Sequence, residues 1–96
     1  MTTPDLKSVR LGDEYDQPLR ELLIAVLRTM GGVIDQTSFG VAGSQALERI
    51  WVTVTSNGRV DRIAIESETY VGLTIAGRAE LVDSIRDAVH ARTLPG

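Results

Sequence analysis

Hydrophobic and polar residues alternate most regularly between Glu48 and Glu66, where two runs of β-branched residues flank Ser56-Asn57-Gly58-Arg59. Asn-Gly favours the positive φ angles that both central residues of a type I′ turn adopt. Alternation with a period of two is typical of strands that have one buried face. The segment therefore predicts a β-hairpin with a two-residue loop.

The register of this hairpin follows from counting outward from the turn. One face is apolar except near the turn, and its pairs are Ile50 with Ile65, Val52 with Ile63, and Val54 with Asp61. The other face is polar with one tryptophan, and its pairs are Arg49 with Glu66, Trp51 with Ala64, Thr53 with Arg62, and Thr55 with Val60. A slip by one residue would exchange the two faces. We expect the first face to lie in the core and the second to form a platform outside it.

Helical patterns flank the hairpin. A first helix is predicted to start at Asp16 or Gln17, with Pro18 in its first turn, and to end after Met30 at a pair of glycines. In a second segment, residues 76–92, apolar side chains recur at helical spacing and charged side chains lie largely on the opposite side.

The rest of the chain predicts one more strand. Residues 37–41 are a short strand candidate followed by a turn at 42–44, and residues 67–74 are interpreted as a connector. The predicted fold class is therefore α+β, in the order α-β-β-β-α, with a three-stranded antiparallel sheet flanked by N- and C-terminal helices. We expect one domain over residues 16–96. Residues 1–15 are expected to be a flexible arm that Leu6, Val9 and Leu11 could pin to the body or to a partner.

The first helix is apolar around most of its circumference, although packing on one small sheet needs only a stripe little wider than 100°. The simplest place for the excess is a symmetric copy, since each additional buried Leu or Ile contributes about 1.5–3 kcal/mol. The predicted homodimer interface consists of Leu19, Leu22, Leu23, Val26, Leu27 and Met30. The alternative is that the N-terminal arm folds back over this helix.

Composition narrows the classes of function. The 96 residues have ten basic and thirteen acidic side chains, one histidine and no cysteine. These counts predict no metal site and no cofactor, and the serines and glycines form no nucleophile or phosphate-binding motif, so we expect neither an enzyme nor a small-molecule substrate. With no signal-peptide pattern and no apolar run of 18 residues, the expected location is the cytoplasm, away from membranes.

The candidate binding patch is the outer face of the hairpin, with Arg49, Trp51 and Arg62, and Arg59 at the turn. Cations beside an aromatic ring can contact phosphates and stack a base. Structural cover of the tryptophan, or a protein interface around it, would explain the same residues. Arg20 and Arg28 on the first helix could also reach phosphates, or lie at an interface rim.

Four stretches of the chain form a recognisable series: Gly40–Gly43 (GVAG), Arg49–Gly58 (RIWVTVTSNG), Arg62–Glu66 (RIAIE) and Glu80–Val89 (ELVDSIRDAV). Together, in this order and spacing, they resemble the YbaB/EbfC family of small bacterial nucleoid-associated proteins. The resemblance covers roughly residues 38–92 and implies a dimeric, non-enzymatic protein that binds double-stranded DNA with little sequence preference. Because the first helix is more apolar than its counterpart in the family, the alternative is an interaction or accessory module on the same fold, such as the YbaB-like proteins associated with type VII secretion.

Overall fold

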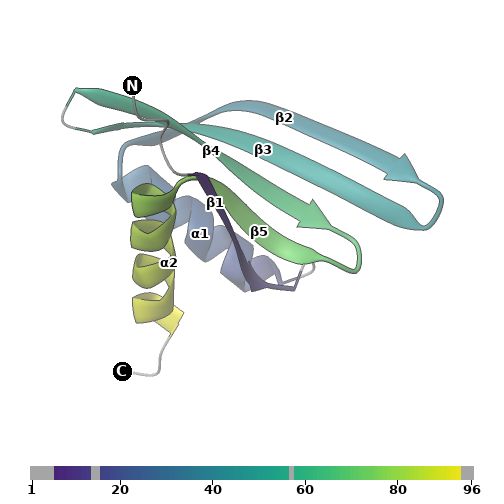
Figure 1. The fold of residues 1–96 in the computed structure, drawn as a ribbon. Helices are drawn as coiled ribbons and strands as arrows, with labels where there is room; N and C mark the ends of the chain where they lie inside the picture. The colour runs from purple at the N-terminus through teal and green to yellow at the C-terminus, as the bar shows by residue number, and fades with distance from the viewer. Residues whose placement is uncertain (1–5, 14–15, 57, 94–96) are drawn as a thin grey trace.

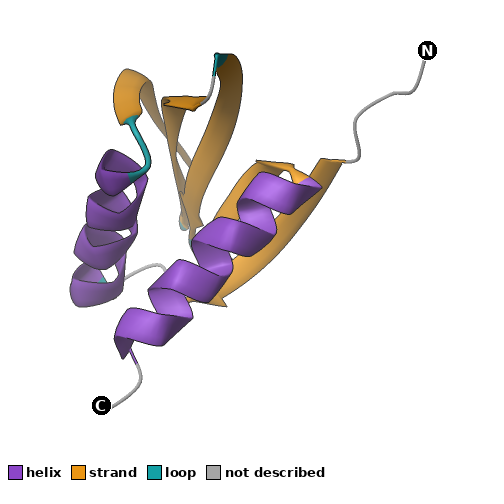
Figure 2. Ribbon diagram, turned by 90° about the vertical axis from the view of Figure 1, so that its left-hand side faces the viewer, coloured by secondary structure: helices purple, strands orange, loops and turns teal. Residues whose placement is uncertain are grey.

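The computed structural model describes residues 6–13, 16–56 and 58–93, and its strands form a single antiparallel sheet with two helices on one face (Figure 1). The elements in chain order are β1 (Leu6–Gly12), α1 (Gln17–Thr29), β2 (Gly32–Ala42), β3 (Gln45–Ser56), β4 (Arg59–Glu68), β5 (Gly72–Arg78) and α2 (Ala79–Thr93). The strand order is β1-β5-β4-β3-β2, which leaves β1 and β2 at the two edges. In Figure 2, α2, the helix that leads to the C-terminus, crosses in front of the strands, and α1 lies beside them on the left of the view.

The prediction of a three-stranded sheet is wrong, because the sheet has five strands. Strand β5 occupies residues that were expected to be a connector and the first turn of the last helix. Only Leu73 and Ile75 alternate into the core there, between Gly72 and Gly77, and so short a run is a weak strand signal. The last helix consequently starts at Ala79 and not near residue 76.

Strand β1 lies within the expected N-terminal arm and pairs antiparallel with β5. Val9 and Leu11 pack against the core, whereas Leu6 is 78% exposed. Because β1 is an edge strand with two charged residues, its own pattern gives little indication that it belongs to the sheet. Its pairing depends on a neighbour more than 60 residues away in the chain.

The central hairpin has the predicted register. Ile50 pairs with Ile65, Val52 with Ile63, and Ser56 with Arg59. The expected core face is buried, since each of its apolar side chains is at most 6% exposed. Gly58 has a φ of +76°, as the turn requires, while Asn57 lies outside the described residues.

Helix α1 begins and ends as predicted. The Asp16 carboxylate accepts a hydrogen bond of 3.0 Å from the backbone N–H of Leu19, which is the bond of an N-cap, and Pro18 lies in the first turn. At the other end Gly31 has a φ of +85°. A Cβ at Gly31 would lie 2.8 Å from the backbone oxygen of Thr55, so both conformation and space require glycine.

The larger sheet also accommodates much of the apolar surface of α1. Of the predicted dimer residues, Leu23, Val26 and Leu27 are at most 2% exposed within one protomer, and Leu19, Leu22 and Met30 are partly buried against the same core. From α2, the core receives Leu81, Val82, Ile85 and Val89. The excess apolar surface of α1, from which the helix-to-helix dimer was predicted, is therefore reduced to the partly buried residues of this helix.

Candidate functional site

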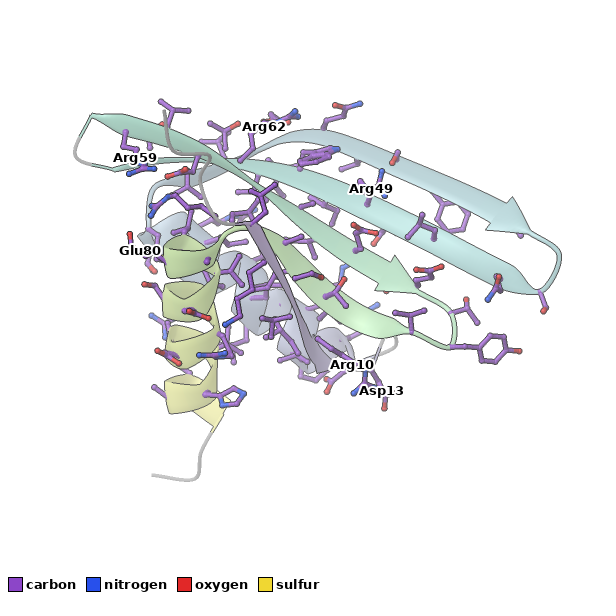
Figure 3. The ribbon with its side chains drawn as sticks, viewed as in Figure 1. Arg10, Asp13, Arg49, Arg59, Arg62 and Glu80 are labelled. Atoms are coloured by element: carbon purple, nitrogen blue, oxygen red, sulfur yellow. The ribbon has the colours of Figure 1, made fainter. Side chains whose placement is uncertain are left out.

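The predicted binding patch lies on the sheet face that carries no helix. Figure 3 shows Arg49 and Arg62 on the side of the sheet opposite the helices. Arg49 and Trp51 come from β3, and Arg62 from β4, at the cross-strand positions that the register predicts. The guanidinium carbon of Arg62 lies 4.6 Å from the centroid of the Trp51 ring, within the range of a cation–π contact. The structure therefore brings these three residues onto one face.

The same face carries carboxylates that pair with both arginines. Arg49 donates to Glu66 at 3.4 Å, and Arg62 donates to Asp35 at 2.8 Å. Asp35 is the extra residue where the β2–β3 register shifts between Ile34 and Gln36, and it also accepts a hydrogen bond from the Thr53 hydroxyl. These contacts lower the pKa of Asp35, chiefly through the hydrogen bond from Arg62 and then that from Thr53. The patch is thus an ion-paired platform, in which each arginine already holds an acidic partner.

The remaining predicted cations are distributed over other surfaces. Arg20 on α1 forms an ion pair with Glu48 of β3, and Arg59 pairs with Asp61 at 3.5 Å. Arg28 is exposed and forms no ion pair with a described residue. The predicted cations therefore do not converge on one basic surface.

The edge strand β2 is exposed along most of its length, whereas the sequence pattern predicts a strand only over residues 37–41. It has eleven residues, and every described side chain from Val33 to Val41 is exposed. Its large apolar side chains are unusually open for an edge strand: Val33 is 66% exposed, Phe39 69% and Val41 64%. In Figure 1 the β2–β3 hairpin extends well beyond both helices. A long, open edge strand with exposed apolar side chains is the type of surface that pairs with another chain.

The backbone groups available on this edge follow from the β2–β3 turn. Its loop is Gly43-Ser44, with Gly43 at a φ of +63° and Ala42 paired with Gln45, as in a type II′ turn. The pair that flanks such a loop is hydrogen-bonded, and bonded and non-bonded pairs alternate along the hairpin. The N–H and C=O groups of Thr37, Phe39 and Val41 therefore face the free edge, and those of Ser38 and Gly40 face β3.

The β3–β4 hairpin gives the same alternation independently. Ser56 and Arg59 flank its two-residue loop, so even-numbered residues of β3 bond to β4 and odd-numbered residues bond to β2. Arg49 and Leu47 are odd-numbered, and their β2 partners are Ser38 and Gly40. Both turns thus leave the same three β2 residues with outward backbone groups.

The opposite edge is protected. Strand β1 has seven residues, two of which are charged, and its pairing with β5 is irregular between Arg10 and Gly12. Lys7 forms a salt bridge of 2.8 Å with Asp83 on α2, and Arg10 donates to the carbonyl of Val71. Charged side chains and irregular pairing discourage addition of a strand. By contrast, residues 36–42 of β2 contain no charge and no proline.

A shallow groove of about 200 Å³ lies beside Phe39, where the first turn of α1 faces β3 and β4. Its lining includes Gln17 and Arg20 from α1 and Glu48 from β3. Phe39, Thr37 and Val41 share the helix-side face of β2, because their β3 partners are Glu48, Ile50 and Ala46. A strand added to the free edge would therefore place every second side chain on the face that carries this groove.

Within the described ranges, no three His, Cys, Asp or Glu side chains are grouped so as to hold a metal ion. Neither of the helices in the described part of the chain has the length and apolarity that crossing a membrane needs. Comparisons of the chain with protein-family models, with curated proteins and with solved structures found no match.

Proposed function

We propose that this chain is a non-enzymatic protein-interaction module that binds an extended polypeptide strand along the free edge of β2. The observation that carries the proposal is the exposure of β2 on an uncharged stretch with outward backbone groups at Thr37, Phe39 and Val41. In strand addition, main-chain hydrogen bonds supply affinity and alternate side chains supply specificity. Phe39 and Val41 are suited to the second role because they lie on one face of β2, and Phe39 lines the groove.

The sheet platform supports a second candidate function, DNA binding with little sequence preference. Arg49, Trp51 and Arg62 lie together on an open face, which suits contact with phosphates and bases. Their pairing with Glu66 and Asp35 means that phosphates would have to displace carboxylates, and the net charge of −3 adds general repulsion. We therefore rank DNA binding below strand addition.

The two candidates differ in their response to salt. Binding of duplex DNA through phosphates should weaken by about 0.9 log units per log unit of salt for each phosphate contact. A titration with duplex DNA at low salt tests this, with Arg62→Ala as the variant and Arg86→Ala, on α2, as the control. Tight, salt-sensitive binding that Arg62→Ala weakens and Arg86→Ala does not would favour DNA over strand addition.

Strand addition is tested with a photo-crosslinking residue placed at Phe39 in the cells that make the protein. The matched control carries the same residue at Ser84, an exposed position on α2. We expect a specific protein adduct at position 39 that Thr37→Pro removes, because proline deletes an outward N–H and adds a ring at the edge. Equal adducts at both positions, or an adduct that survives Thr37→Pro, would contradict the proposal.

A further inference from the structure

The geometry points to a second copy of this chain as the strand that pairs with β2, so that two five-stranded sheets become one ten-stranded sheet across a two-fold axis. This inference rests on the proposed function and names its occupant. A two-fold interface places the same patch on both partners, so the patch must be complementary to itself. Strand β2 meets this requirement in one register.

The register is set by the two ends of the regular part of β2. On one side the pairing shifts between Ile34 and Gln36, and on the other the chain turns at Gly43-Ser44. The uninterrupted stretch is therefore residues 36–42, and its midpoint is Phe39. Antiparallel pairing centred at Phe39 uses the whole stretch, whereas centring on Ser38 or Gly40 leaves an end of it unpaired.

The alternation of the backbone agrees with that centre. Phe39 has outward N–H and C=O groups, so it would exchange both hydrogen bonds with Phe39 of the partner subunit. Thr37 and Val41 also have outward groups, and each would pair with the other residue across the axis. The three pairs provide main-chain hydrogen bonds on the axis and on either side of it.

The side chains are also compatible with this register. Two Phe39 rings meet at the axis, and Thr37 faces Val41, which are aromatic and β-branched pairs of the kind that stabilise neighbouring strands. On the other face, Ser38 lies opposite Gly40, so small residues meet. Residues 36–42 bring no charge into the pairing, and Asp35 would lie beyond it, opposite Gly43 of the partner subunit.

The size of the contact predicts a reversible dimer. Each copy would contribute seven strand residues, with Phe39 and Val41 as the large apolar side chains. The total surface area buried by such a contact is at the small end of the range for specific interfaces, below about 1,200 Å². We therefore expect dissociation at micromolar concentrations, so sedimentation should show monomers of 10.4 kDa when dilute and dimers when concentrated.

Engineered cysteines test the register, because the chain has none of its own. Ser38→Cys and Gly40→Cys are made as separate proteins; both positions are exposed, and a Cβ at Gly40 meets no atom within 4 Å. In the proposed register, residue 38 lies opposite residue 40 of the partner as a non-hydrogen-bonded pair, with Cα atoms about 4.5 Å apart, within the range of a disulfide. Identical positions are offset by two residues along the strands, about 7 Å.

When the Ser38→Cys and Gly40→Cys proteins are mixed and oxidised, we expect severalfold more covalent dimer than when either protein is oxidised alone. The covalent dimer should be lost when both proteins also carry Thr37→Pro. Equal yields in the mixture and in the single variants, or no covalent dimer in the mixture, would overturn the register. A protein that stays monomeric at all concentrations would overturn self-pairing altogether. The photo-crosslinking residue at position 39 distinguishes the two failures. If it crosslinks in cells to a different protein, and Thr37→Pro removes that adduct, strand addition stands while self-pairing fails. If it crosslinks to nothing, both fail.

Discussion

Two proline substitutions at adjacent positions of β2 should destabilise the fold to very different extents. The N–H of Thr37 faces the free edge, so Thr37→Pro removes no bond of the β2–β3 ladder. The N–H of Ser38 faces Arg49 across the ladder, so Ser38→Pro removes such a bond and turns the proline ring toward β3. Comparison of the two proline variants therefore tests which backbone N–H groups of β2 form no hydrogen bond with β3.

The magnitudes follow from the hydrogen bonds that are lost. Thr37→Pro should change the free energy of unfolding of the monomer by less than about 1 kcal/mol, as is usual for an exposed site without a lost contact. Ser38→Pro loses a bond worth about 0.5–1.5 kcal/mol and leaves a carbonyl facing the ring, at a further cost of about 1–3 kcal/mol. We expect a destabilisation of about 1.5–4.5 kcal/mol for Ser38→Pro.

Urea unfolding of dilute protein, followed by the fluorescence of the single tryptophan, measures both values. Dilution keeps the protein monomeric, so that loss of association does not enter the comparison. Equal destabilisation by the two prolines, or a larger effect of Thr37→Pro, would refute the assignment of outward and inward backbone groups.

Further predictions concern the core, the platform and two glycines. Ile63→Ala should lower the free energy of unfolding by about 2–5 kcal/mol because the side chain is fully buried, whereas Val60→Ala, at a 64% exposed position, should change it by less than about 0.5 kcal/mol; urea unfolding tests both. The pKa of Asp35 is lower in the folded protein than its unfolded value of about 3.8. The contribution of the Asp35 carboxylate to the free energy of unfolding is therefore complete above the unfolded pKa and disappears as pH falls through the lower folded pKa. The difference in melting temperature between the wild type and Asp35→Asn should therefore be present at pH 7 and close in strong acid, and a difference independent of pH would contradict the ion pair. Gly31→Ala should destabilise by at least about 1 kcal/mol, because of its positive φ and the nearby Thr55 oxygen, while Gly40→Ala should leave dilute protein within about 0.5 kcal/mol of wild type, both measured by thermal unfolding.

The central hairpin was predictable because its determinants are local. Asn-Gly defines the loop, alternation defines the buried face, and the two together define the register, so the placement of Arg49, Trp51 and Arg62 on one face was predicted as well. Glu66 was expected opposite Arg49 for the same reason. What the sequence could not provide was the set of contacts made at long range.

The missed elements depend on neighbours that are distant in the chain. Strand β1 has few apolar residues of its own and becomes a strand by pairing with β5, which in turn is short and contains glycines. The irregularity at Asp35 interrupts the alternation of β2, so Val33 and Ile34 were not assigned to a strand, and the partnership of Asp35 with Arg62 was not predicted. Much of the apolar surface of α1 that was predicted to be in excess packs against a sheet of five strands, which is wider than the predicted sheet of three.

Residue-specific amide hydrogen exchange along β2, measured in dilute and in concentrated protein, tests the free edge most directly. In dilute protein the amides of Thr37, Phe39 and Val41 should exchange quickly and those of Ser38 and Gly40 slowly. In concentrated protein we expect the first three to become protected as a second strand covers the edge. Slow exchange of Phe39 in dilute protein, or fast exchange that no concentration alters, would contradict a free edge that pairs with another copy.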